Sequence, residues 1–149
     1  MRAVVVDDED RVLLVRLEFP HWAGWVLPGG GVEDGEEDLA AVRRELAEEL
    51  GLVDPPLVGP IWERTVLFSG AAPYDGQVER IYFLRCAPFT PAPQLSRHLL
   101  RAEGVTDMRW WRPDDLAACT ETIAPSRLCA LLAELAEVGP PLSIVDVSE

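Results

Sequence analysis

The segment from Gly30 to Leu52 constrains this chain more than any other part of its sequence. It places two glycines, four glutamates and one arginine at fixed offsets: Gly30, Glu36, Arg44, Glu45, Glu48, Glu49 and Gly51. Apolar residues in the same stretch repeat at helical spacing and share one face within roughly 80°, at about 100° per residue. They are Leu39, Val42, Leu46 and Leu50. The segment therefore predicts an amphipathic helix over residues 37–50, ended by a C-terminal glycine.

Three glutamates crowd one face of this helix, beside the apolar stripe. Glu45, Glu48 and Glu49 span about 100°, and the chain contains no lysine that would neutralise them. Like charges three or four positions apart each cost an isolated helix roughly 0.2–0.5 kcal/mol. The face is either the solvated surface of an acidic protein or a site for a divalent cation, since carboxylate oxygens suit Mg²⁺ or Mn²⁺. Arg44 is the nearby cation whose planar fork is able to grip and orient a carboxylate.

The complete spacing favours the cation site. Seven fixed identities arise by chance on the order of 10⁻⁹ per starting position at average residue usage. The segment resembles the Nudix box at every fixed position, with apolar Leu46 and Leu52 in place. The preceding glycine-rich residues 25–31 resemble the family's approach to its loop–helix–loop motif, and family-like features extend from Ala3 to about Val138.

The resemblance implies a fold, a reaction and a set of site residues. The implied fold is the α/β Nudix sandwich of α/β/α layers, a mixed sheet flanked by helices. The implied reaction is Mg²⁺- or Mn²⁺-dependent hydrolysis of a phosphoanhydride in a nucleoside diphosphate linked to another moiety. The implied metal ligands are Glu45, Glu48 and Glu49, with the backbone carbonyl of Gly30. Arg44 joins the catalytic set as a residue that orients a glutamate rather than one that touches substrate.

A further glutamate from outside the box is expected to join the site. Glu103, in the long loop before the strand at residues 105–111, is the first candidate as a metal ligand or base; its alternative is a solvated loop carboxylate. Glu79 is the second candidate, but a cross-strand pair with Arg64 explains it equally well. The general base is left open, with Glu48 or Glu49 preferred over Glu103, because neighbouring carboxylates titrate as a coupled set.

Length and composition favour a single domain over residues 1–149. A hydrophobic fraction of 48% indicates a packed globule. No apolar stretch approaches the ~20 residues that span a bilayer, and acidic residues follow the N-terminal apolar run too early for a signal peptide. An odd number of cysteines without metal-ligand spacing agrees with free thiols. We therefore expect a cytoplasmic protein that has no membrane contact.

The remaining elements predict a mixed sheet covered by helices. Strands are expected at residues 2–6, 11–17, 25–27, 58–68, 77–86 and 105–111. A loop is expected from Phe19 to Gly24, another through Gly70, Pro73, Tyr74 and Gly76, and a long irregular one from Ala87 to Gly104. Pro113 opens a brief helix, and residues 125–138 form a terminal amphipathic helix.

The substrate and the partners are less constrained. The net charge of −13 argues against duplex nucleic acid and against RNA cap removal, since phosphate contacts need basic surface. Candidate substrates are small anionic nucleotides: ADP-ribose or a nucleotide sugar, a dinucleoside polyphosphate, or a modified (d)NTP. Aromatic side chains able to stack on a base are Trp22, Trp62, Phe68, Tyr74 and Trp110. The rival function is a regulatory module that binds a nucleotide ligand without turnover. The apolar tail at residues 142–147 either pairs with a second subunit, forming a homodimer, or docks on its own chain.

Overall fold

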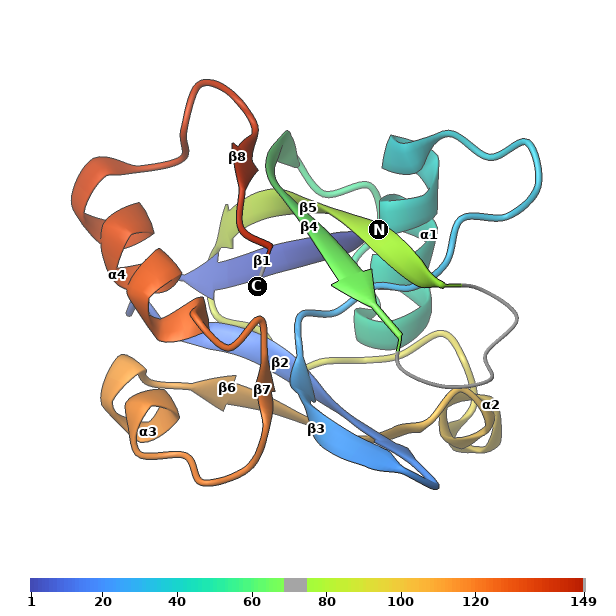
Figure 1. Cartoon of the computed structure of the whole chain (residues 1–149). Coiled ribbons are helices and arrows are strands. Elements are labelled where there is room, and N and C mark those ends of the chain that lie inside the picture. Colours follow the sequence, from blue (N-terminus) through green and yellow to red (C-terminus); the bar gives the residue numbers. More distant parts are fainter. Residues whose placement is uncertain (69–74, 149) are drawn as a thin grey trace.

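One mixed sheet runs through the molecule (Figure 1). The computed structural model describes residues 1–68 and 75–148, so the expected loop positions Gly70, Pro73 and Tyr74 lie outside the described residues. The strands are β1 (Arg2–Asp7), β2 (Val12–Phe19), β3 (Trp22–Val26), β4 (Val58–Leu67), β5 (Gly76–Cys86), β6 (Val105–Trp111), β7 (Ile123–Ala124) and β8 (Val145–Asp146). The helices are α1 (Asp38–Leu50), α2 (Arg97–Ala102), α3 (Pro113–Ala117) and α4 (Leu128–Val138).

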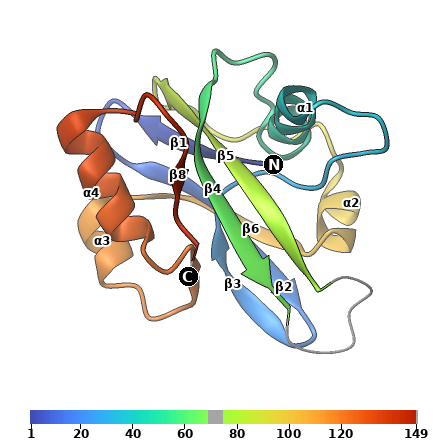
Figure 2. The ribbon, with the colours of Figure 1, turned by 45° about the horizontal axis from the view of Figure 1, so that its top comes forward.

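The sheet has two halves that meet where β1 pairs with β2. Strands β1, β5, β4 and β8 form one half, and β6, β2, β3 and β7 form the other. The pairs β1–β5, β3–β7 and β4–β8 are parallel, whereas the other pairs are antiparallel. Within the described residues β1 and β2 are in register at Val6 and Val12. Because this junction is so short, the two halves turn away from each other and the sheet curls (Figure 2).

Helices α1 and α4 cover opposite sides of this sheet (Figures 1 and 2). Successive side chains of a strand point to opposite faces, and β1 divides its residues accordingly. Val4 and Val6 pack in the core that includes the buried leucines of α4, whereas Ala3 and Val5 pack in the core that includes Val42, Leu46 and Leu50 of α1. The predicted α/β/α sandwich is therefore confirmed, although Leu39 of the predicted apolar stripe is 36% exposed.

The β2–β3 hairpin is longer than the sequence pattern predicted. Residues 19–24 were expected to form a loop, but Phe19 pairs directly with Trp22, which leaves a two-residue turn. Such short turns keep the flanking strands paired to their ends, and two aromatic side chains facing each other across the strands add to the pairing.

The long segment before β6 contains an unexpected helix. Residues 87–104 were expected to be irregular, yet 97–102 form α2. Ser96 caps this helix, because its hydroxyl accepts a 3.2 Å hydrogen bond from the backbone N–H of Leu99. The terminal helix, in turn, begins at Leu128 rather than at Pro125.

The C-terminal tail docks on its own chain. Strand β8 pairs in parallel with β4, and the N–H of Val147 donates a 2.9 Å hydrogen bond to the carbonyl of Glu63. The Val147 side chain is buried in the core on the α4 side. Of the two alternatives for the tail, the structure therefore supports docking within the chain. Within residues 1–68 and 75–148, every helix is too short or too polar to pass through a lipid bilayer.

Candidate active site on helix α1

Helix α1 ends in a motif that fixes the position of its last turn. Gly51 has a φ of 76°, in the left-handed region. Its N–H donates to the carbonyl of Ala47, and the N–H of Leu52 donates to the carbonyl of Leu46. This pattern satisfies carbonyls that the helix leaves free. A Cβ at Gly51 would collide with the Ala92 carbonyl oxygen. The glycine therefore serves both the turn and the close approach of the following loop.

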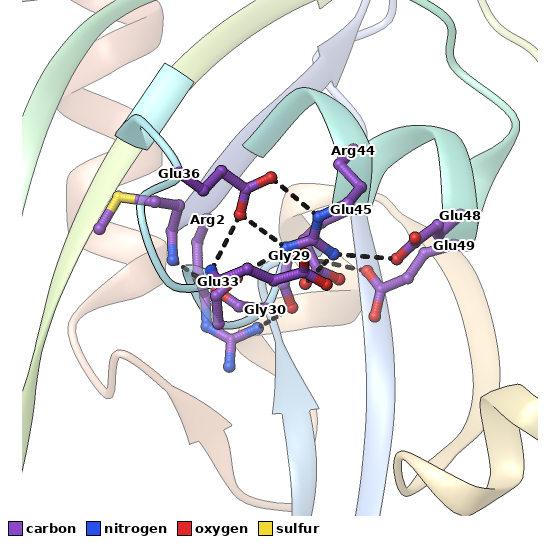
Figure 3. A network of polar contacts seen from close by, with 11 residues as sticks. Arg2, Gly29, Gly30, Glu33, Glu36, Arg44, Glu45, Glu48 and Glu49 are labelled. Atoms are coloured by element: carbon purple, nitrogen blue, oxygen red, sulfur yellow. Dashed lines mark hydrogen bonds and ion pairs between the residues drawn. The ribbon is translucent and has the colours of Figure 1, made fainter. Parts of the chain in front are cut away.

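Arg44 holds three carboxylates beside this helix (Figure 3). Its Nε and Nη2 donate to the two oxygens of Glu36 at 2.9 and 3.0 Å. Its Nη1 donates to Glu45 at 2.9 Å and to Glu48 at 3.1 Å. The guanidinium is bidentate to Glu36 and bridges the other two carboxylates, which suits a residue that positions carboxylates.

Glu36 lies in the loop just before α1. A glutamate at this position could supply negative charge to the first turn of the helix, but α1 begins at Asp38. The Glu36 carboxylate accepts instead from Arg44 and from the N–H of Glu33, at 3.0 Å. The hydrogen bond from Arg44, followed by that from Glu33, lowers the pKa of Glu36. Glu36 therefore closes the loop over α1 as the partner of Arg44.

Two glycines bring the loop against the glutamates. Gly29, with a φ of 131°, donates its N–H to Oε2 of Glu49 at 2.9 Å. A Cβ at Gly30 would collide with the Glu45 carboxylate. The Gly30 carbonyl accepts a 2.5 Å hydrogen bond from the amino group of Met1, and a carbonyl oxygen has a second lone pair for another ligand.

Burial and mutual repulsion shift the titration of two glutamates. Glu45 is 7% exposed and Glu49 is 3% exposed. The pKa of Glu49 is raised to about 7, mainly by burial. The hydrogen bond from the Gly29 N–H and the charge of Arg2 lower this pKa, whereas the charges of Glu45 and Glu103 raise it further. Burial also raises the pKa of Glu45, against its bond to Arg44, with added repulsion from Glu48 and Glu103. Carboxylates in such surroundings favour a proton or a nearby cation.

The structure brings Glu103 toward these carboxylates from a different part of the chain. Glu103 ends α2, and the next residue, Gly104, accepts a 2.9 Å hydrogen bond from the N–H of Glu18 on β2. The charge of Glu103 contributes to the raised pKa of both Glu45 and Glu49. Glu103, the first candidate from outside the box, thus lies at the end of a helix that the sequence pattern did not predict.

The donor set suits a divalent cation after side-chain adjustment. Among the described residues, no three carboxylate, imidazole or thiol groups are arranged to hold a metal ion as they stand. Arg44 engages one oxygen of Glu45 and one of Glu48, while Gly29 engages one oxygen of Glu49. The other oxygen of each carboxylate makes no hydrogen bond in the described part of the chain. Hard oxygen donors of this kind match Mg²⁺ or Mn²⁺.

Glu79 lies in an ionic network on β4 and β5. It is in register with Arg64, as the cross-strand alternative predicted, and the two side chains approach to 3.0 Å. Its other oxygen accepts from Arg2 Nε at 2.9 Å. Arg2 was not among the predicted site residues, although the alternation of β1 places it on the same face as Val4 and Val6.

The aromatic candidates separate into buried and exposed residues. Trp62 is buried in the core, whereas Trp110 is partly buried and donates its indole N–H to the Phe89 carbonyl at 2.9 Å. Trp22 and Phe68 are 38% and 41% exposed. Tyr74 lies outside the described residues. Trp22 and Phe68 therefore remain the described candidates for stacking on a base.

Comparisons with known proteins agree with this fold and this helix. A family model described as the NUDIX domain matches residues 1–131. The chain is 32% identical over 109 residues to nucleoside triphosphatase NudI of Escherichia fergusonii, covering 72% of this chain and 74% of that protein. It is 38% identical over 127 residues to Nudix hydrolase 25 of Arabidopsis thaliana, covering 76% of this chain and 71% of that protein.

Solved structures share the same architecture. The NUDIX domain of Shewanella oneidensis NrtR, complexed with ADP ribose, superposes with a TM-score of 0.66 at 23% identity, covering 91% of this chain and 84% of that chain. The MutT Nudix hydrolase of Burkholderia pseudomallei superposes with a TM-score of 0.59 at 26% identity, covering 88% and 93%. The chain belongs to the Nudix hydrolase family. Its class of activity is that of a Nudix pyrophosphohydrolase.

Proposed function

We propose that this protein hydrolyses a phosphoanhydride bond in a nucleoside diphosphate linked to another moiety, with Mg²⁺ or Mn²⁺ as cofactor. The observation that carries the proposal is the cluster of partly and fully buried glutamates on α1, held by Arg44 and closed by the glycine loop. Glu45, Glu48, Glu49 and the Gly30 carbonyl hold the metal ion, with Glu103 as the further ligand or base. The bound ion supplies charge neutralisation and an acidified water.

The chain's own residues have two tasks in the proposed reaction. They must attract an anionic substrate, and one carboxylate must accept the proton of the attacking water. The protein carries a net charge of −13, so an anionic substrate meets repulsion that only local positive charge overcomes. A general base works best when its pKa lies near the operating pH. Burial raises the pKa of Glu49 to about 7 in the metal-free protein, but a cation bound to Glu49 would lower that pKa. Glu48, Glu49 and Glu103 therefore all remain candidate bases. Arg44 acts by positioning Glu45 and Glu48.

The substrate class follows from the kind of molecule that such a site and its relatives accept. Relatives and structural neighbours are named as a nucleoside triphosphatase, as an Ap4A hydrolase and as a domain complexed with ADP ribose. These names support a panel of ADP-ribose, diadenosine tetraphosphate and nucleoside triphosphates. The panel is tested with Mg²⁺ and with Mn²⁺, and products are identified by chromatography.

The decisive variants are Glu48→Gln and Glu49→Gln. Each is expected to lower metal-dependent turnover at least about a hundredfold while the fold remains, because each removes a charged oxygen donor or a base. Glu137→Gln, on the exposed side of α4, is the control and should keep full turnover. Unchanged turnover in both α1 variants would contradict the assignment.

The same panel tests the rival function. Tight binding of one compound without cleavage of any panel member would favour a regulatory module over an enzyme. A homodimer also remains a proposal, and the elution volume of the protein in gel filtration, compared at several concentrations, tests it.

A further inference from the structure

Arg64 is a buried cation whose bonding capacity is incompletely used. In the described residues three buried side-chain nitrogens lack a hydrogen bond: Arg43 Nε, Arg64 Nε and Trp111 Nε1. Trp111 packs in the apolar core, and the Arg43 side chain is 41% exposed beside Asp54. Arg64 is 9% exposed as a residue, so solvent does little to compensate it. An unsatisfied buried charge is costly, and Arg64 is the one of the three that shares a carboxylate with Arg2, which is bonded to the glycine loop.

Glu79 does not fully compensate the positive charge around it. Its Oε1 accepts from Arg2 Nε and from the side-chain amide of Gln77, both at 2.9 Å. Its Oε2 lies 3.0 Å from Arg64 Nε, although the alignment falls short of a hydrogen bond. Two guanidinium groups therefore share the Glu79 carboxylate, which is a surplus of one positive charge within this group of three side chains. The charge of Arg2 also acts on Glu49, which lies outside the group.

Arg2 connects this surplus to the glycine loop of the candidate active site. Its Nη1 donates to the carbonyls of Leu27 and Gly29, at 2.8 and 3.0 Å. Gly29 in turn donates its N–H to Glu49. Arg2 therefore lies two contacts from a proposed metal ligand, through Gly29. Arg2 is on β1 and Arg64 on β4, the two strands that flank β5 and its Glu79.

We propose that Arg64, positioned by Glu79 and Arg2, binds the phosphate group of the substrate that the metal ion does not neutralise. The inference rests on the proposed function, since it assumes a diphosphate held beside the α1 glutamates. A diphosphate carries more negative charge than its metal-bound oxygens account for, and the planar fork of arginine matches phosphate oxygens. Binding would also compensate the buried surplus charge, which Glu79 alone leaves incompletely paired.

The same two strands offer a matched control. Glu63 and Arg80 form another Arg–Glu pair in direct register, one position along from Arg64 and Glu79. Because successive residues point to opposite faces, this pair lies on the other face, where Arg80 also pairs with Asp38 of α1. The Arg80 side chain is 46% exposed. Arg80→Met therefore removes a cross-strand ion pair of the same kind on the other face of these strands.

The test measures binding of methylenediphosphonate, a diphosphate that cannot be hydrolysed at its bridge, by calorimetry in the presence of Mn²⁺. Arg64→Met is expected to weaken diphosphonate affinity about tenfold to a hundredfold, as expected for lost hydrogen bonds to a charged group. Mn²⁺ affinity without diphosphonate, measured by electron paramagnetic resonance, should stay within about twofold. Arg80→Met should leave both affinities within about twofold. The twofold limit corresponds to the change of up to about 0.5 kcal/mol that surface substitutions usually cause.

Arg64→Lys keeps the inference testable if Arg64→Met fails to fold. Lysine retains the charge beside Glu79 but lacks the fork, so diphosphonate affinity should fall severalfold while Mn²⁺ affinity and thermal stability remain near those of the wild type. Unchanged diphosphonate affinity in the Arg64 variants, an equal loss in Arg80→Met, or no binding of diphosphonate by the wild type would overturn the inference. Failure of the proposed function looks different: the wild type would bind no Mn²⁺, or Glu48→Gln would keep its turnover.

Discussion

Helices α1 and α4 cover opposite sides of one sheet, yet their buried faces differ in kind. The buried face of α4 consists of leucines at helical spacing, Leu128, Leu131 and Leu135. The buried face of α1 combines Val42, Leu46 and Leu50 with two carboxylates, Glu45 and Glu49. Both helices are long enough to pack against a sheet, but only in α1 does the packed face include ionisable groups.

The difference shows that the two helices serve different purposes. Burial of leucines on α4 removes apolar surface from water and stabilises the fold. Burial of carboxylates on α1 disfavours their charged forms, and the raised pKa of both Glu45 and Glu49 reflects this. Helix α1 therefore carries a local destabilisation that a cation is able to relieve, whereas α4 contributes packing alone.

The largest expected effect comes from breaking the packing of α4. Leu131→Ala should lower the free energy of unfolding by about 4 kcal/mol, because Leu131 is 4% exposed in the core and truncation leaves a cavity. Urea denaturation followed by circular dichroism measures the change. At temperatures where the variant is folded, its Mn²⁺ affinity should equal that of the wild type; a parallel loss of metal affinity would mean that the two sides of the sheet are coupled.

On α1, Glu49→Gln is expected to raise the free energy of unfolding, by less than Leu131→Ala lowers it. The pKa of Glu49 in the folded protein is about 7, above its ordinary value of 4.5. The contribution of protonated Glu49 to the free energy of unfolding is therefore fully present below pH 4.5. It is lost as the pH rises through about 7. Glu49→Gln cannot ionise, and its amide oxygen still accepts the N–H of Gly29. In metal-free protein the variant should exceed the wild type by roughly 3 kcal/mol at pH 8 and by little at pH 4.5.

Urea denaturation in EDTA at the two pH values measures this difference. Addition of Mn²⁺ at pH 8 should stabilise the wild type more than the variant, because binding to the folded state raises stability by mass action. A variant that is no more stable than the wild type at pH 8 would show that burial does not disfavour the charged form of Glu49.

The smallest effect is expected at Leu39, the residue of α1 that helical spacing placed on the core. It is 36% exposed, and alanine is the better helix former. Leu39→Ala should change the free energy of unfolding by less than about 0.5 kcal/mol. A loss near that of Leu131→Ala would indicate that the Leu39 side chain contributes to the core after all.

Much of the fold followed from local sequence patterns. The box helix, the strand at residues 105–111 and the short helix opened by Pro113 were each predicted close to their observed positions, since periodicity, a stop glycine and an N-terminal proline are signals within a few residues. The prediction was wrong where pairing across the chain decided the structure. The β2–β3 hairpin extends through Trp22 because strand pairing continues to the turn, and α2 forms in a segment without a long apolar repeat.

The candidate site divides in the same way. Spacing along one helix was enough to bring Glu45, Glu48, Glu49 and Arg44 together, because residues three and four apart are neighbours on a helix surface. Glu79 was ambiguous in the sequence, since its partner Arg64 lies on another strand. Arg2 gave no signal of its own, because its contacts are with residues at least 25 positions away.

The amino-acid sequence by itself determined the family, the acidic face of one helix and the glycines that flank this helix, because these features depend on residue identity at short spacing. Only the tertiary structure decided how deeply each carboxylate is buried, that Glu103 approaches from α2, and that Arg2 and Arg64 share Glu79. Burial and ion pairing depend on distances between segments far apart in the chain, and those distances exist only after the sheet has curled and its helices have packed.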